Sequence, residues 1–185
     1  MNKRALLCAL IMGALPAAAL AAPTVTFEGE VTDQTCKVLI NGQTNAVVLL
    51  PTVSMQDFGV PLANAQTAGL TPFTVSLTGC TAPTDAAMNI STVFMGYDVD
   101  AASGVLGNRA TANAAKGFGI QLTEKSDDKE TGIKLSGITP VAGLTLAVGE
   151  TEAQHQFGAQ YYVLDATQAA AGKITAVAEY TLSYF

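Results

Sequence analysis

Apolar and polar residues alternate along much of the chain, and this alternation predicts β-strands. In residues 24–32 one face of a predicted strand is apolar or small, whereas the other carries threonine and glutamate; the first face comprises Val25, Phe27, Gly29 and Val31. Alternation recurs from Phe73 to Cys80 and from Phe118 to Leu122. Side chains two residues apart lie on the same face of a strand, so each run predicts one face turned towards a core.

Further short strands are expected at 46–50, 88–95, 133–135, 144–148, 157–164 and 173–185, and short helical turns at 56–68 and 167–171. In the last of these strands one face includes Tyr180, Leu182 and Tyr184. About seven or eight short strands separated by turn signals indicate an all-β domain, either an antiparallel sandwich or a barrel.

The first residues have the pattern of a secretory signal peptide. Lys3 and Arg4 precede a short apolar core, and Pro16 comes before the small-residue site that ends at Ala21. A membrane-spanning helix is the alternative, but the apolar run is short, contains a proline and lacks a basic flank on its far side. We therefore expect residues 1–21 to be a signal peptide cleaved after Ala21, or after Ala22. The exported chain is expected to have no stable membrane insertion.

Composition and charge narrow the possible partners. The chain has 185 residues, 49% of them hydrophobic and 13% charged, with a formal net charge of −6. Removing the signal peptide makes the charge more negative and leaves only scattered cations. Because phosphate backbones are bound by clustered lysine and arginine, nucleic-acid binding is not expected.

The cysteines agree with export. Cys8 leaves with the signal peptide, and Cys36 and Cys80 remain as an even pair. In an oxidising compartment such a pair is expected to form a disulfide, worth about 4 kcal/mol for a loop of this length. A metal site is the alternative, but two cysteines and His155, the one histidine of the chain, are too few for four ligands.

Motifs for chemistry are missing from the sequence. There is no nucleophile elbow, phosphate-binding glycine loop or paired-histidine zinc motif. Residues 98–100 resemble the start of a calcium loop, but the later oxygen ligands do not follow. The charged stretch 124–131 is interpreted as a solvated turn. We expect neither an enzyme nor a bound cofactor or metal.

Apolar strands at both ends of the exported chain are unusual, because unpaired strand edges template pairing with other chains. Both could pair within their own domain, or pairing between chains could be their purpose. The residues alone leave both interpretations open, but several motifs match those of a known family: the strand 24–31 leading to Cys36, the run 73–80, the run 155–162, Gly172 at the 14th position from the C-terminus, and the penultimate Tyr184. With these motifs the chain resembles type 1-like fimbrial subunits of the chaperone–usher pathway.

The resemblance implies an incomplete immunoglobulin-like sandwich at residues 34–185, which lacks its last strand and is completed by a donor strand from a neighbouring subunit. Residues 22–33 would be the donor extension, with Val25, Phe27, Gly29 and Val31 entering the neighbour's groove. Gly172, Tyr180, Leu182 and Tyr184 would mark the strand beside that groove. The implied partners are other fimbrial subunits, a periplasmic chaperone and an outer-membrane usher. The chain would pass through the periplasm to a fimbria on the cell surface.

The expected function is a structural fimbrial subunit that supports adhesion. The alternative is a minor adaptor or tip subunit with a direct binding role. The stretch before Cys36 is shorter than in many rod subunits, which leaves the choice between rod and adaptor open. A secreted β-sandwich enzyme is the third class. It is not favoured, because His155 is the one histidine and the sequence has no catalytic motif around it.

Overall fold

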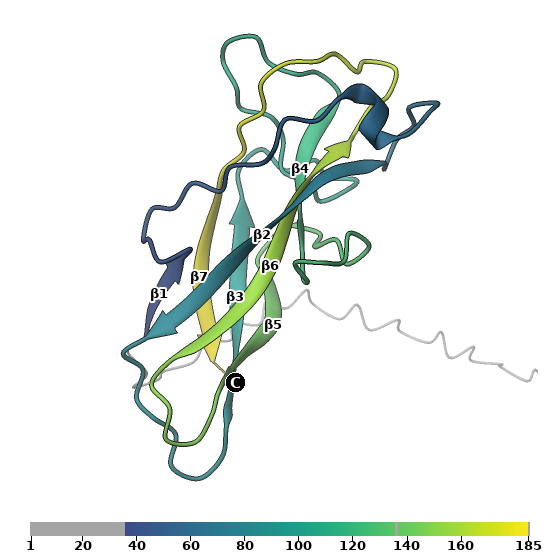
Figure 1. Ribbon diagram of the computed structural model, residues 1–185. Coiled ribbons are helices and arrows are strands. Elements are labelled where there is room, and N and C mark those ends of the chain that lie inside the picture. The colour runs from purple at the N-terminus through teal and green to yellow at the C-terminus, as the bar shows by residue number, and fades with distance from the viewer. Residues whose placement is uncertain (1–35, 136, 185) are drawn as a thin grey trace, which may run out of the picture. The chain divides into compact units, whose positions relative to one another are not determined.

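The computed structural model describes residues 36–135 and 137–184. These residues form two antiparallel β-sheets (Figure 1). The first sheet has the spatial order β1 (Lys37–Ile40), β2 (Thr67–Thr78), β6 (Ala153–Val163) and β4 (Phe118–Thr123). The second has the order β5 (Thr139–Leu146), β3 (Met88–Gly96) and β7 (Ala178–Tyr184), and a short 3-10 helix, η1, spans Met55–Phe58.

An aromatic cluster joins the two sheets. Phe73 on β2 lies directly opposite Phe157 on β6, and their ring centroids are 5.7 Å apart. Phe94 comes from β3 in the other sheet and meets Phe157 edge to face at 5.3 Å. All three rings are buried. Burying each contributes about 1.5–3 kcal/mol, so the alternation seen in the sequence places the strongest apolar contacts between the sheets.

A smaller apolar cluster lies at the ends of β4 and β6 that meet η1. It contains Phe58, whose ring centroid is 5.1 Å from that of Phe118. Tyr161 and Ile174 contact both this cluster and the main core. The two clusters therefore form one continuous apolar interior.

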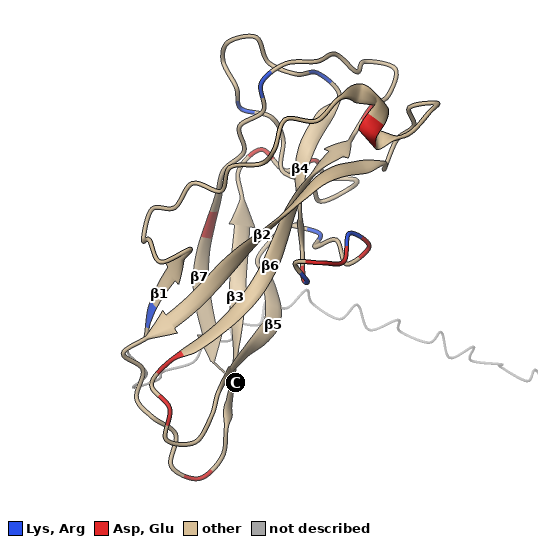
Figure 2. Cartoon of the chain, viewed as in Figure 1, with Lys and Arg blue, Asp and Glu red and all other residues tan. Residues whose placement is uncertain are grey.

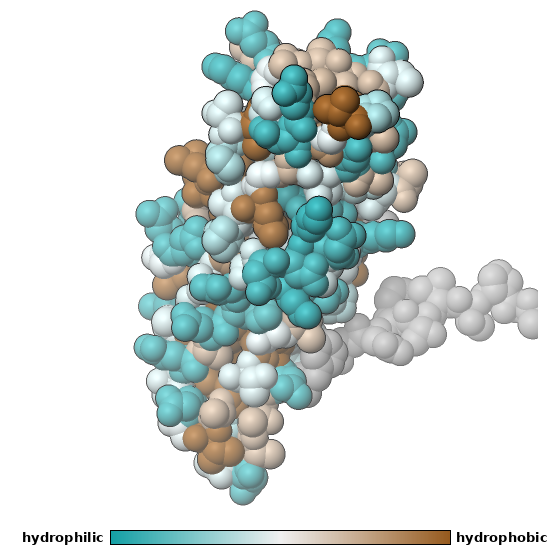
Figure 3. Space-filling view, turned by 45° about the vertical axis from the view of Figure 1, so that its right-hand side comes forward, coloured by the Kyte–Doolittle hydropathy of each residue, from teal (hydrophilic) through white to brown (hydrophobic). Residues whose placement is uncertain are grey.

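Charged residues lie mainly in the loops (Figure 2). Within the described strands, the charged side chains are Lys37 on β1 and Glu179 on β7. On the face seen in Figure 3, apolar residues form small separate areas among polar ones. No helix in the described part of the chain is long and apolar enough to span a membrane.

The all-β, two-sheet prediction is confirmed, and the predicted strands at 73–80, 88–95 and 118–122 coincide with parts of β2, β3 and β4. The predicted helical turn within 56–68 overlaps η1. The last strand is shorter than predicted, because residues 173–175 bond to a loop and only 178–184 join β3. The strand predicted at 24–32 lies outside the described residues.

Three predicted elements are wrong, and one was missed. Residues 133–135 bond to two different segments, with Ile133 donating to Leu122 and Leu135 to Gly104, so they form no continuous ladder. The segment 46–50 is extended but not part of a sheet, and residues 167–171 form no helix. The sequence pattern gave no sign of β1, because its four residues are too few to show alternation.

Candidate functional site

The strand β7 has one unpaired edge. On one side it pairs with β3, with Leu182 opposite Thr92. On its other side no described residue pairs with it. From residue 174 to residue 182, half-buried side chains alternate with exposed ones, and Ser183 and Tyr184 are both half-buried. The half-buried apolar set comprises Ile174, Ala176, Ala178, Tyr180, Leu182 and Tyr184. The edge therefore offers both free backbone groups and a row of apolar side chains.

A second extended segment, residues 46–50, has the same character. Ala46, Val48 and Leu50 pack against the core, whereas Val47 is 75% exposed and Leu49 is 81% exposed. Its backbone groups make no hydrogen bond to other described backbone. The segment alternates like a β-strand but pairs with no described strand. Like the edge of β7, it therefore has backbone N–H and C=O groups available for hydrogen bonds.

The two segments face each other and run in opposite directions. The Tyr180 hydroxyl donates to the carbonyl of Thr44 over 2.7 Å, which ties the start of one segment to the middle of the other. At the far end, Thr52 and Gly172 line the same pocket. In Figure 1 the chain between β1 and η1 accordingly runs alongside β7. Between these two contacts, residues 46–50 and β7 have no described strand between them. The inner side chains of both pack against the main core.

The pocket at the far end has a volume of about 570 Å³. Thr52–Met55 and Ala171–Thr175 contribute to its lining, together with Phe58, Ala115, Phe118 and Tyr161. Most of its side chains are apolar, although Lys173 also contributes to the lining, and burial raises the pKa of the Tyr161 hydroxyl. The pocket thus suits an uncharged apolar side chain.

The sequence-predicted residues of the last strand come together. Tyr180, Leu182 and Tyr184 lie on one face of β7, and burial raises the pKa of the Tyr184 hydroxyl. Gly172 lies outside the strand, in the lining of the pocket. The four residues predicted for the donor strand, Val25, Phe27, Gly29 and Val31, lie outside the described residues.

Sequence reasoning missed the facing segment and the pocket. The alternation of Ala46, Val48 and Leu50 was a usable signal, but it predicted an ordinary strand rather than an unpaired one. Phe58 and Phe118 meet only because η1 folds back onto β4, and no local pattern indicates that.

Cys36 and Cys80 form a disulfide, with their Cα atoms 4.2 Å apart. Cys36 comes just before β1 and Cys80 two residues after β2, and Lys37 pairs with Thr78. The bridge therefore closes the open end of the β1–β2 pair, at the point where the N-terminal segment joins the sandwich.

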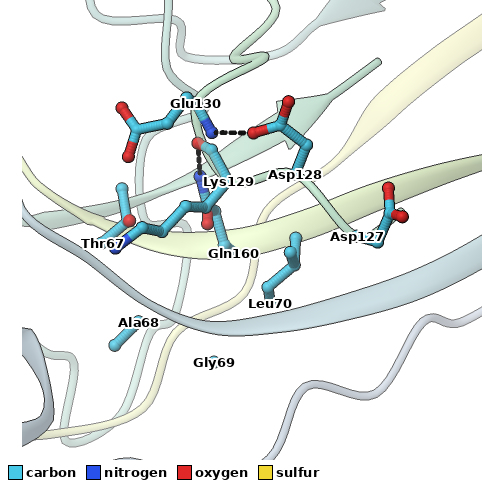
Figure 4. A pocket seen from close by; sticks show the side chains of 9 residues that line it. All are labelled: Thr67, Ala68, Gly69, Leu70, Asp127, Asp128, Lys129, Glu130 and Gln160. Carbon is cyan, nitrogen blue, oxygen red and sulfur yellow. Dashed lines mark hydrogen bonds between the residues drawn. The ribbon is translucent and has the colours of Figure 1, made fainter. Parts of the chain in front are cut away.

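A second pocket, of about 410 Å³, lies between the loop 127–130 and β2 and β6 (Figure 4). The amide of Gln160 donates to the carbonyl of Lys129 and to the side chain of Gln121, each over 2.9 Å, and so fixes the loop onto the sheet. Despite its acidic residues, the described part of the chain contains no cluster of three histidine, cysteine or acidic residues able to hold a metal ion. His155 bonds to the carbonyl of Glu124 and packs edge to face on Phe157.

Comparison with known proteins identifies the family to which this sandwich belongs. Residues 25–185 match the family described as "Fimbrial protein". The chain belongs to this family. The fimbrial chain is 37% identical to the major fimbrial subunit SMF-1 of Stenotrophomonas maltophilia (strain K279a), over 94% of its own length and 99% of the relative's. It is 32% identical to the F17 fimbrial protein of Escherichia coli, over 94% and 96% of the two lengths.

A solved structure agrees on the fold. A chain from a chaperone–usher pilus superposes with a TM-score of 0.55 at 17% identity, covering 92% of the fimbrial chain and all of the solved chain. The family resemblance drawn from the sequence is thereby confirmed, as is the incomplete immunoglobulin-like fold class. The protein is a structural subunit of a fimbria, and its relatives are structural fimbrial proteins.

Proposed function

We propose that this subunit polymerises by donating residues 22–33 to the slot between residues 46–50 and β7 of a neighbouring copy. The observation that carries the proposal is the pair of facing edges, each with free backbone groups and inner apolar side chains. A single inserted strand can bond to both edges at once. It would complete the sheet that contains β5, β3 and β7.

The alternation in the donor segment complements the slot. Val25, Phe27 and Val31 share one face of the predicted strand and would be buried against the row that includes Leu182 and Tyr184. Burying three such side chains yields roughly 5–9 kcal/mol before the cost of ordering the segment. The small Gly29 on the same face suits a place where the two backbones approach closely.

The length of the donor segment is sufficient. Ten extended residues span about 33 Å, whereas the seven residues of β7 need about 24 Å. The segment can therefore follow the whole edge of β7 and extend about three residues further, as far as Thr175 at the near wall of the pocket.

The same exposed edge accounts for the proposed partners. An unpaired, half-apolar strand invites aggregation, so a chaperone strand would cover it in the periplasm until an outer-membrane usher brings the next subunit. The family's residues for this contact are Gly172, Tyr180, Leu182 and Tyr184. The protein would then be a surface fibre subunit that binds other subunits and catalyses no reaction.

The test is a pair of charge variants of equal size. Val25→Asp with Phe27→Asp places two carboxylates on the inner face of the donor strand, and we expect no fibres on the cell surface by electron microscopy. Thr24→Asp with Thr26→Asp places the same two charges on the outer face, and fibres should remain. Normal fibres from the first variant would contradict the proposal.

A further inference from the structure

The chain that leads into β7 is held by a loop instead of by the sheet. The ladder between β3 and β7 ends at Gly96 and Ala178, with one more bond from Tyr97 to the Val177 carbonyl. Before that point, the backbone of Lys173 bonds to Asn113 over 2.7 Å and to Ala115 over 2.9 Å. The loop 108–115 thus replaces β3 as the partner of residues 173–175.

One side chain makes most of the remaining bonds. The Nδ2 group of Asn108 donates to the carbonyls of Lys173 and Ala115 over 2.8 and 2.9 Å. Its Oδ1 atom accepts from the backbone N–H of Thr175 over 3.0 Å and from that of Ala110 over 2.9 Å. The amide of Asn108 therefore uses both donor hydrogens and accepts two bonds, tying three stretches of chain together.

Apart from the bonds of Asn108, the loop is anchored by backbone hydrogen bonds and by Arg109, which forms an ion pair with Asp98 and lies over the ring of Tyr97. The other residues between Asn108 and Ala115 are small or polar, and residues 111–114 are exposed. Only Ala115 is buried, and it contributes to the small apolar cluster. A loop without large apolar side chains depends on hydrogen bonds for its position.

Gly172 explains how the two backbones come so close. A Cβ atom on this residue would lie 2.4 Å from the Asn113 carbonyl oxygen and 2.5 Å from the Ala115 nitrogen. Any other residue would push the 172–175 segment away from the loop and lengthen the bonds that Asn108 makes. Gly172, which the family resemblance implies as part of the strand beside the groove, therefore has a packing role here.

The anchored segment is a wall of the larger pocket. Ile174 lies between the two residues that Asn108 holds, Lys173 and Thr175, and it contacts both apolar clusters. Fixing the backbone on either side of Ile174 fixes the wall that this side chain forms. A pocket kept in shape before binding avoids the ordering cost at the moment of binding.

We propose that Asn108 is a positioning residue for strand insertion, which keeps the pocket at one end of the slot open for an apolar side chain of the incoming donor strand. This role rests on the proposed function, because it takes the pocket to be one end of the donor-strand site. Asn108 itself does not line the pocket and acts through residues 173–175.

The test measures strand exchange on the full-length subunit, purified in complex with its periplasmic chaperone. A synthetic peptide of residues 22–35 is added, and release of the chaperone is followed over time. We expect Asn108→Ala to slow exchange about tenfold, since it removes several hydrogen bonds that hold the wall. Asn108→Asp keeps the shape and the acceptors but loses the two donor hydrogens, and it should slow exchange similarly. Thr111→Ala, an exposed change in the same loop, should exchange like the wild type.

Two further peptides separate positioning from general destabilisation. One carries Val25→Ala and the other Val31→Ala, which truncate opposite ends of the donor strand. The pocket lies beyond one end of β7, so only one end of the donor strand can place a side chain in it. The slowing of exchange caused by Asn108→Ala should therefore be smaller with the peptide truncated at that end and unchanged with the other. An equal effect with all three peptides would overturn the positioning role.

The remaining outcomes are also decisive. If the wild-type subunit exchanges its chaperone for the peptide and Asn108→Ala does so at the same rate, the role of Asn108 is overturned. Strand donation is then unaffected. A wild-type subunit that never exchanges with its own peptide overturns strand donation, and the role of Asn108 with it.

Discussion

Thr92 is a polar residue at the centre of β3 with no access to solvent. Its hydroxyl oxygen is buried and has no hydrogen-bond partner among the described residues. On β3 it shares a face with Ile90 and Phe94, which belong to the apolar core. A buried hydroxyl without a partner costs stability, because it has given up its bonds to water without replacing them.

Replacing this hydroxyl by a methyl group tests the cost. Thr92→Val keeps the branched shape and should stabilise the folded subunit by about 1 kcal/mol, measured by urea unfolding. Ser91→Ala on the opposite face of the same strand is the control, since the Thr92 hydroxyl is the buried side-chain oxygen without a partner among the described residues. A loss of stability in Thr92→Val would mean that the hydroxyl does find a partner.

At the scale of elements, β7 combines an edge paired with β3, an edge that pairs with no other described strand, and an apolar face. Its face alternation could be predicted from the sequence, because Tyr180, Leu182 and Tyr184 are spaced by two. Its free edge could not, since hydrogen-bond partners depend on which strands are brought together by the rest of the chain. The same limit explains 46–50, where a correct alternation predicted a paired strand and the fold left it unpaired.

The two faces of β7 should respond differently to charge. Leu182→Asp places a carboxylate on the half-buried face and should reduce the amount of folded subunit and abolish fibres, because burying that charge costs at least about 2 kcal/mol. Thr181→Asp, one residue away on the exposed face, should be tolerated. Immunoblots of exported subunit and electron microscopy of fibres give the comparison. Equal damage from both variants would contradict a one-sided site.

At the scale of the whole domain, short-range patterns predicted an all-β domain, the disulfide pair and the main strands, whereas the incomplete immunoglobulin-like class came from the family resemblance. These short-range patterns could not predict contacts between residues that are far apart in the sequence. The pocket requires η1, β4 and the 171–175 segment to converge, and these lie far apart in the chain. The hydrogen bonds from Asn108 to Lys173 and Thr175 likewise join residues 65 or more positions apart in the sequence.

The disulfide contributes to the stability of the domain as a whole. It joins residues 44 positions apart, and a loop of this length corresponds to about 4 kcal/mol in the chain-entropy account. Cys36→Ser with Cys80→Ser should lower the free energy of unfolding in urea by about that amount. Reductant should lower the wild type to the same level and leave the double variant unchanged. Insensitivity of the wild type to reductant would contradict this.

The position of that bridge also matters when a fibre is stretched. If residues 22–33 are donated as proposed, tension along the fibre enters the sandwich at Cys36. Next along the chain is β1, a four-residue strand at the sheet edge that could separate from β2 one hydrogen bond at a time. The covalent link passes the load to the end of β2, which is flanked by strands on both sides. The weakest strand is thereby bypassed, and under load the fibre is expected to yield at its non-covalent joints before its subunits unravel.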